Sequence, residues 1–263
     1  MRMVARDGLT GVSVDVDTRA PTGATTAYIL GESDAVLVDP AGRSDALDEA
    51  LEDWNVSHLA LTHHHHDHTG GVAAYADAYD LTVWARAGRA ADFEAATGVA
   101  PDRSFRDGVV LPAGGGVTVV ETPGHAPEHA AFVAGDGLVT GDLAVAEGSV
   151  VVGAPEGDMR AYITSLRRVH ARDPAVLYPS HGPVIEDPRA TCRRLIDHRR
   201  QREQRVLAAV DDGAETLGTV VDAAYEKDIT DVRDLALATA RAHLEKLAVE
   251  GRVRWDGERA RPG

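Results

Sequence analysis

The sequence predicts a mixed α/β domain followed by a smaller, mainly helical module. Two observations indicate this. Short apolar runs alternate with helical segments or hairpin turns through the first two thirds of the chain, which is typical of layered α/β domains. The charge also divides the chain: its 263 residues carry a formal net charge of −15, yet residues 187–263 contain 15 acidic and 15 basic groups. We therefore expect one domain over residues 1–186 and a second module over 187–263.

Each element of the larger domain has a local signal. Apolar, β-branched runs bounded by Gly, Pro or Asp predict strands, and Ser44 before an acidic first turn predicts a helix N-terminus. The strands are expected at 26–30, 35–39, 57–61, 81–85, 117–121, 130–133, 138–140 and 176–178. The helices are expected at 44–54, from Gly71 to about 78, and at 159–169.

The smaller module is predicted to contain three helices and a hairpin. A long Arg-rich helix is expected over 188–210, a short one over 217–225 and a third from an Asp231 cap to Gly251. Residues 252–259 predict a β-hairpin on an Asp-Gly turn. This order resembles a small winged-helix module. The arginines of the long helix fit a solvated face and a nucleic-acid contact equally well.

Composition excludes several classes of protein. Cys192 is the only cysteine, so neither an internal disulfide nor a structural cysteine zinc site can form. No apolar run reaches the roughly 18 residues of a membrane helix, and we expect a cytoplasmic protein that does not contact membranes. The acidic balance, with only two lysines, resembles that of proteins from salt-loving microbes.

The chemistry is concentrated in the segment His63-His64-His65-His66-Asp67-His68. Side chains two residues apart on an extended segment point to the same side, so His63 and His65 can bind one ion. Asp67 and His68, on the turn that follows, can reach a second ion. Neutral imidazole and carboxylate both suit zinc. His64 and His66 alternate away from these ligands and are expected to pack or to face solvent.

Three further segments each place one ligand at the end of an expected strand. They are His125 in Thr-Pro-Gly-His, Asp142 in Thr-Gly-Asp, and His181 in Pro-Ser-His-Gly-Pro. The adjacent Gly or Pro permits a tight loop near a metal. Each segment alone is a weak signal, and the three together are a strong one.

The order His63-x-His65-x-Asp67-His68, His125, Asp142, His181 resembles the metallo-β-lactamase superfamily. The resemblance implies a four-layer αβ/βα sandwich with two metal ions at one edge. It implies that one zinc is held by His63, His65 and His125, and a second by Asp67, His68 and His181. Asp142 would bridge the two ions. Manganese or iron could occupy the same ligands.

This ligand set predicts hydrolysis by a metal-bridging hydroxide, because one zinc already lowers the pKa of water from ~15.7 to about 7. Asp67 would be catalytic, since it can accept a hydrogen bond from the hydroxide and orient it. His129 is a second catalytic candidate, as leaving-group acid or substrate contact, and a structural role is an equal alternative. The sequence assigns no residue to substrate binding.

The later motifs refine the resemblance and leave the substrate open. One large class of zinc β-lactamases has a cysteine where Asp142 stands, so antibiotic hydrolysis is disfavoured. The segments at 180–185, 198–204 and 243–251 resemble the lactamase-β-like group, which includes an endoribonuclease acting on single-stranded RNA. The same group resembles glyoxalase II, a thioesterase. The expected substrate is therefore single-stranded RNA or a small thioester or ester.

Charge bears on this choice in two ways. A domain of net charge −15 repels RNA, but molar salt would screen that repulsion to ~3 Å. A metal-sensing DNA-binding regulator is a further alternative. The third helix of the module offers few basic side chains beyond Arg233, Arg241 and Lys246, so duplex DNA is not an expected partner. A homodimer is left open.

Overall fold

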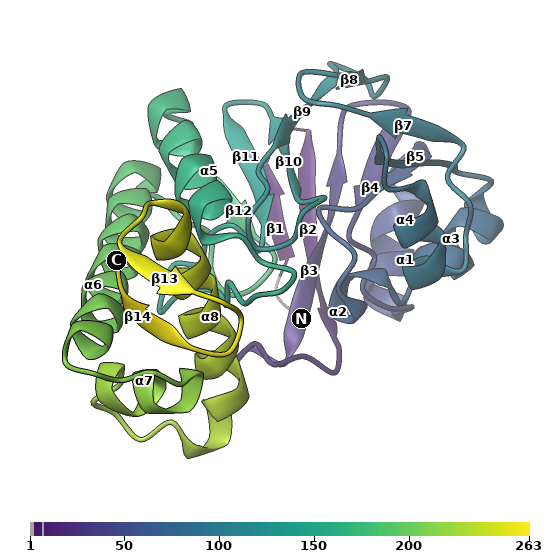
Figure 1. Ribbon diagram of the computed structural model, residues 1–263. Coiled ribbons are helices and arrows are strands. Elements are labelled where there is room, and N and C mark those ends of the chain that lie inside the picture. The colour runs from purple at the N-terminus through teal and green to yellow at the C-terminus, as the bar shows by residue number, and fades with distance from the viewer. Residues whose placement is uncertain (1–2, 7) are drawn as a thin grey trace. The chain divides into compact units, whose positions relative to one another are not determined.

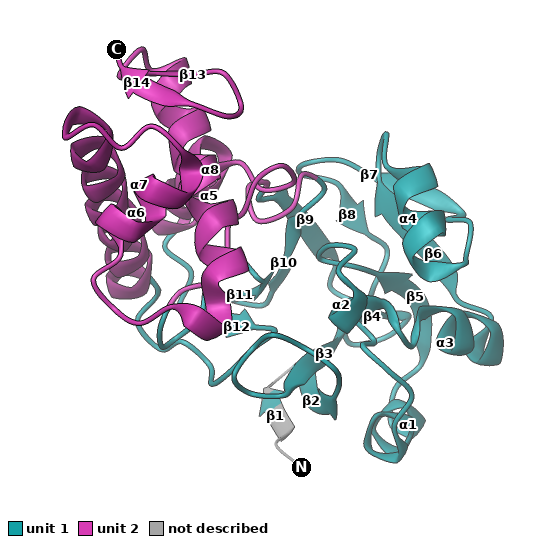
Figure 2. Ribbon diagram, turned by 60° about the horizontal axis from the view of Figure 1, so that its bottom comes forward, with its two compact units in different colours: residues 1–122, 128–148, 173–188 teal, residues 123–127, 149–172, 189–263 magenta. Residues whose placement is uncertain are grey.

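The computed structural model describes residues 3–6 and 8–263. By internal contacts, the chain forms two compact units (Figure 2). The first contains the residues up to 122, with 128–148 and 173–188. The second contains 123–127, 149–172 and 189–263. The second unit thus includes a five-residue loop and a helical segment from the middle of the chain.

A seven-stranded sheet, counted over the described residues, is the centre of the first unit, and its strands follow the order of the sequence (Figure 1). The first four strands form an antiparallel meander, and the last four are parallel neighbours. The strands are β1 (Met3–Arg6), β2 (Leu9–Asp15), β3 (Ala24–Leu30), β4 (Ala35–Val38), β5 (Val56–Ala60), β6 (Thr82–Arg86) and β7 (Arg103–Phe105).

Parallel neighbours need crossover connections, and helices supply them. The helices between these strands are α1 (Asp45–Glu52), α2 (His66–Thr69), α3 (Val72–Tyr79) and α4 (Ala90–Thr97). The expected helix cap is confirmed, because the Ser44 side chain accepts a hydrogen bond from Leu47 N.

A second sheet has the order β12-β11-β10-β9-β8 over the described residues. Its strands are β8 (Val110–Leu111), β9 (Val117–Glu121), β10 (Ala130–Ala134), β11 (Gly137–Gly141) and β12 (Leu177–Pro179). β11 and β12 run parallel, while the other neighbours are antiparallel. The strands β1, β2, β7 and β8 and the helix α4 were not expected from the sequence, and α2 was expected as a turn. These strands are short or alternate apolar with polar residues, and α4 buries Phe93 alone, so each gave a weaker signal than the continuous apolar runs.

The larger sheet is buried on both faces, which explains its continuous apolar strands. Ala35 and Leu37 of β4 pack in a cluster with α1, α3 and α4, whereas Val36 and Val38 pack in a second cluster with the other sheet. This two-residue alternation places helices on one face and a sheet on the other. The first unit therefore has helix, sheet and sheet layers, and the α/β class is confirmed.

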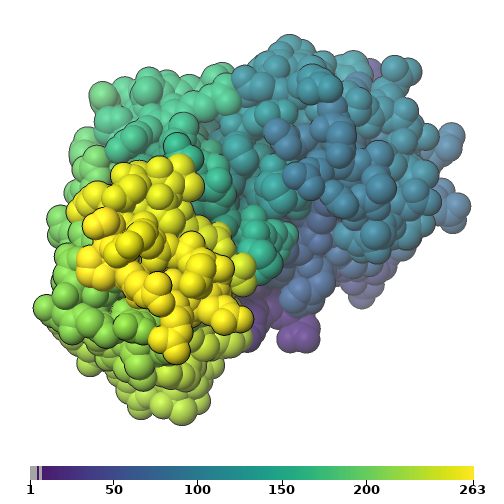
Figure 3. Space-filling model, in the orientation of Figure 1, coloured from purple at the N-terminus to yellow at the C-terminus, as the bar shows by residue number. Residues whose placement is uncertain are grey.

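The second unit contains the remaining helices and a two-stranded hairpin. Its elements are α5 (Met159–Arg172), α6 (Pro188–Asp211), α7 (Leu217–Ala224), η1 (Thr230–Val232), α8 (Arg233–Val249), β13 (Val253–Trp255) and β14 (Ala260–Pro262). Val206, Val220 and Leu244 belong to a buried cluster that joins three of these helices and the hairpin. In the space-filling view the hairpin, in yellow, lies at the surface beside the green helices (Figure 3).

The helices of this module follow the expected order. The hairpin was expected over 252–259, and its strands extend further along the chain, to Pro262. Its second strand begins at Ala260, because the turn at 256–259 is closed by hydrogen bonds from the backbone of Glu258 and Arg259 to Asp256. The winged-helix identity stays a prediction. Among the described residues, no helix is both long enough and apolar enough to cross a bilayer.

Candidate metal centre

The histidine-rich segment follows β5 directly and changes conformation within itself. His65 is extended, with φ −65° and ψ 147°, and α2 begins at His66. His63 and His65 thus share an extended stretch, and His63 Nε2 lies 3.0 Å from His65 Nδ1. Asp67 and His68 lie on the short helix instead. The local backbone therefore separates the four side chains into two pairs.

His68 presents one ring nitrogen to the centre of this site. Its Nδ1 is 2.9 Å from Asp39 Oδ2, and the side chain is fully buried. Its Nε2 has no hydrogen-bond partner among the described residues, although it lies 3.9 Å from Asp67 Oδ1 and 3.8 Å from Asp142 Oδ1. Burial lowers the pKa of His68, but the Asp39 carboxylate outweighs it, so the pKa is raised.

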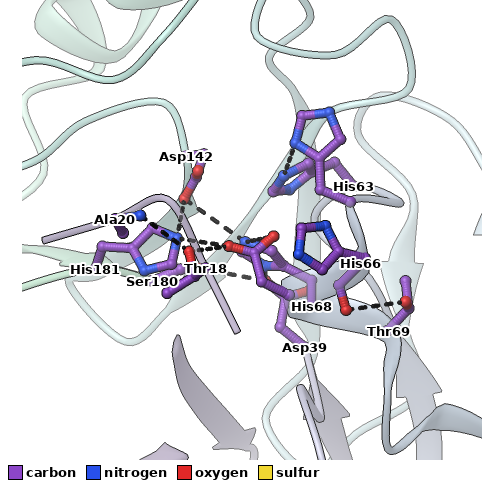
Figure 4. Close-up of polar contacts among 12 residues, drawn as sticks. Thr18, Ala20, Asp39, His63, His66, His68, Thr69, Asp142, Ser180 and His181 are labelled. Carbon is purple, nitrogen blue, oxygen red and sulfur yellow. Dashed lines mark hydrogen bonds and ion pairs between the residues drawn. The ribbon is translucent and has the colours of Figure 1, made fainter. Parts of the chain in front are cut away.

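His181 lies on the loop after β12 and approaches Asp142 (Figure 4). Its Nε2 is 3.3 Å from Asp142 Oδ1 and 3.6 Å from Asp67 Oδ2. Its Nδ1 donates to the backbone oxygen of Ala24 at 2.9 Å. Burial lowers the pKa of His181, and the hydrogen bond and charge of Asp142 overcome that effect and raise it to about 9. Without a metal, two carboxylates thus hold a proton on this ring.

The chemistry of these donors fits a divalent metal. Within the first unit, two sets of side chains have ligand atoms within 4.8 Å of one another: His63, His68 and Asp142, and Asp67, His68 and His181. Neighbouring ligands around a tetrahedral zinc with bonds of ~2.1 Å are about 3.4 Å apart. The separations of 3.3–3.9 Å among Asp67, Asp142 and the two imidazoles are close to that value. Three of these four separations, 3.6, 3.8 and 3.9 Å, are longer than an ordinary hydrogen bond.

His125 lies on the loop 123–127, which belongs to the second unit. Its Nδ1 donates to the backbone oxygen of Val151 at 2.7 Å, so Nε2 carries the lone pair that a metal would need. Gly124 precedes it with φ +137°, and a Cβ there would lie 2.2 Å from Tyr162 N. Only glycine fits this position.

Asp39 contacts the candidate ligand His68 and was not singled out by the sequence analysis. It follows β4 with φ 51° and is fully buried. Its carboxylate accepts hydrogen bonds from Thr62 N at 2.7 Å, Thr62 Oγ1 at 2.6 Å and Ser180 Oγ at 3.3 Å, in addition to the contact with His68. A carboxylate at the end of an entirely apolar strand was the signal available. Asp39 fixes His68 so that Nε2 faces the carboxylates.

The loop between β2 and β3 supplies a second residue without a sequence signal. Thr18 Oγ1 donates to Asp67 Oδ2 at 2.5 Å. His66 Nε2 is 2.9 Å from the backbone oxygen of Asp17, so this ring faces the loop. His64 contacts Glu128 through its backbone and packs edge-on to the Phe93 ring. Neither His64 nor His66 belongs to the sets of close ligand atoms.

His129 is fully buried behind His63. Their ring centroids are 5.3 Å apart, and His129 Nδ1 is 2.8 Å from Thr122 Oγ1. A side chain with no exposed surface has no direct access to a substrate. The geometry therefore favours the structural role over the catalytic one, and the catalytic role stays a prediction.

The comparisons with known proteins agree with this geometry. Residues 20–181 match the family model of the metallo-beta-lactamase superfamily. A beta-lactamase-like protein 2 homolog of Drosophila melanogaster is 31% identical over 250 residues, covering 88% of this chain and 84% of that protein. An atrochrysone carboxyl ACP thioesterase of Aspergillus fumigatus is 29% identical over 235 residues, covering 80% of this chain and 71% of that protein.

Likeness to solved structures extends over almost the whole chain. A metallo-beta-lactamase family protein of Thermus thermophilus superposes with a TM-score of 0.79 and is 26% identical. The match covers 98% of this chain and 99% of that protein, so it includes the C-terminal helices. The chain belongs to the metallo-beta-lactamase superfamily and is a hydrolase, because the family match, the fold and the clustered histidines and aspartates all agree.

Proposed function

We propose that the protein is a binuclear metal hydrolase that cleaves thioesters. Asp67, His68 and His181 would hold one ion, His63, His65 and His125 the other, and Asp142 would bridge them. The buried donor set around His68 Nε2 supports this assignment. Zinc suits the nitrogen and oxygen donors, and manganese or iron would accept the same set.

The residues of this chain would each have a distinct task in the reaction. Bound metal ions supply Lewis acidity and lower the pKa of water to about 7. Asp67 would accept a hydrogen bond from the attacking water and aim its lone pair at the carbonyl carbon. The Thr18 hydroxyl donates to Asp67 Oδ2 and so fixes the carboxylate. Asp39 holds the His68 ring in place.

The observation that carries the choice of thioester is the similarity to an ACP thioesterase over 80% of the chain. Water would add to the thioester carbonyl, the C–S bond would break, and a carboxylic acid and a thiol would leave. The charge of this chain favours the same choice, because a net charge of −15 repels a polyanion such as RNA.

A side-by-side assay tests the substrate. Acyl-pantetheine thioesters and single-stranded RNA are offered to the zinc-loaded protein at low and high salt. We expect thioester turnover and intact RNA. RNA cleavage without thioester turnover would make the endoribonuclease alternative correct.

The test of the site uses Asp67→Asn, with His66→Gln as its matched control on the same helical turn. Asp67→Asn is expected to lower kcat by about 10²–10⁴, the contribution of a positioned proton acceptor. His66→Gln should retain most activity, because this ring contacts the backbone of Asp17. Elemental analysis should find about two metal ions per wild-type chain.

A further inference from the structure

The loop that carries His125 connects β9 and β10 and also contacts α5 and the residue before that helix. Ser165 Oγ donates to the backbone oxygen of Pro123 at 2.7 Å. Asp158 N donates to the backbone oxygen of Gly124 at 2.8 Å. The side chain of His125 is then oriented by one further hydrogen bond, from Nδ1 to the oxygen of Val151. The position of that oxygen therefore helps to set the direction of the imidazole.

The segment around Val151 has no regular structure of its own. Residues 149–153 lie outside every helix and strand, so no ladder of backbone hydrogen bonds places them. Ala154 N donates to the backbone oxygen of Ala238 in α8 at 3.1 Å, which holds one end. The other end receives hydrogen bonds from side chains of α6.

Two consecutive residues of α6 supply those contacts. Arg199 donates from Nη2 to the backbone oxygen of Val150, the neighbour of the residue that accepts from His125. His198 Nε2 lies 3.4 Å from Ser149 Oγ. The Arg199 bond is the stronger of the two, because its donor is charged and only 3% of the residue is exposed.

Arg199 also contacts the helix that supports the loop. Its Cζ is 5.5 Å from the centre of the Tyr162 ring, and the backbone of Tyr162 packs on Gly124. Among residues 3–6 and 8–263, no carboxylate forms an ion pair with Arg199, and its Nε has no hydrogen-bond partner. Burying a guanidinium without a paired carboxylate costs folding free energy. The stability of α6 alone therefore does not account for an arginine at this position.

We propose that Arg199 is a positioning residue for the metal ligand His125. By binding the oxygen of Val150 and packing on Tyr162, it places the Val151 oxygen that keeps the proton on His125 Nδ1 and the lone pair on Nε2. The inference rests on the proposed function, in which His125 binds the same ion as His63 and His65. It gives the C-terminal helix α6 a role in metal binding.

The test is a zinc titration of the full chain in competition with a chromophoric chelator, which resolves the two affinities. Arg199→Met removes the donors and keeps an apolar stem of similar length. We expect one zinc affinity to fall about 10–100-fold, the usual effect of losing a residue that orients a ligand, while the other stays unchanged. The matched control is Arg200→Met, because Arg200 is exposed and pairs with Asp197 at 3.7 Å.

Unchanged zinc affinities in folded Arg199→Met would overturn the proposal, and so would equal weakening of both sites. If Arg199→Met does not fold, Arg199→Lys replaces it. Lysine keeps the charge and one donor but loses the planar fork, so the same site should weaken several-fold; unchanged affinities would again overturn the proposal.

A double mutant separates this inference from the proposed function. His125→Ala should weaken the same site, and adding Arg199→Met should then have little further effect, since both changes act through one imidazole. Additive losses would overturn the role of Arg199 and leave the ligand set standing. Unaltered zinc affinities in His125→Ala alone would overturn the ligand assignment itself, and with it the inference.

Discussion

The two parts of the candidate centre are held by different means. His68 lies on the short helix α2, and one buried carboxylate, Asp39, binds its ring together with Thr62 after β5 and Ser180 after β12. His125 lies on a loop that depends on an irregular segment and on helices of the second unit. One shared carboxylate thus fixes the first part of the centre, whereas the second part depends on a series of separate contacts, each of which can be removed on its own.

Removing Asp39 should have the largest effect. Asp39→Ala leaves the buried donors of Thr62 and His68 without an acceptor, and we expect about 3–5 kcal/mol of lost stability together with weaker metal binding. Denaturant unfolding with and without zinc measures both. Asp34→Ala is the matched control, since Asp34 also has positive φ beside β4 but is exposed. Equal losses in the two variants would contradict the special role of Asp39.

The loop of His125 can be disturbed at its glycine. Gly124→Ala forces a Cβ against the Tyr162 backbone at positive φ, with an expected cost of about 1–3 kcal/mol. Thermal unfolding and zinc titration should show that the site of His125 weakens more than that of His181. Gly148→Ala, also at positive φ but with open space around it, is the control for strain alone.

A smaller change tests the orientation of Asp67. Thr18→Val removes a hydrogen bond to a carboxylate worth about 1.5–3 kcal/mol, so kcat should fall about 10–100-fold with little change in metal content. The control is Thr22→Val in the same loop, where the hydroxyl donates only to a backbone oxygen. Loss of metal in Thr18→Val would indicate a structural role instead.

The smallest expected effect is a pH dependence of the free energy of unfolding that arises from His198 in the second unit. Burial and the neighbouring Arg199 lower the pKa of His198 to about 4, so between about pH 6.5 and 4 the unfolded chain binds a proton that the folded chain does not. The free energy of unfolding should therefore fall as the pH drops through this range. Chemical denaturation at several pH values checks this, and His198→Phe should flatten the dependence. An unchanged slope in His198→Phe would contradict it.

The sequence by itself determined the kinds of ligand and much of the fold. His63 and His65 are two residues apart on an extended segment, so their side chains point to the same side. Asp67 and His68 lie on the turn that follows and point elsewhere. Local geometry therefore predicted these two pairs. The alternation of short apolar runs with helical segments indicated a layered α/β domain. Gly124 before His125 indicated a tight loop, and the structure shows that the missing Cβ makes room for the backbone of Tyr162.

Only the tertiary structure decided how the ligands are oriented. Asp39 and Ser180 are 141 residues apart, and Arg199 reaches Val150 across 49. Such contacts have no periodic or local signature, because they depend on which surfaces meet after the sheets and helices have packed. A carboxylate after an apolar strand, or an arginine in a helix rich in arginines, looks ordinary until its partner is known. The physical reason is that propensity acts between neighbours in the chain, whereas burial selects partners in space.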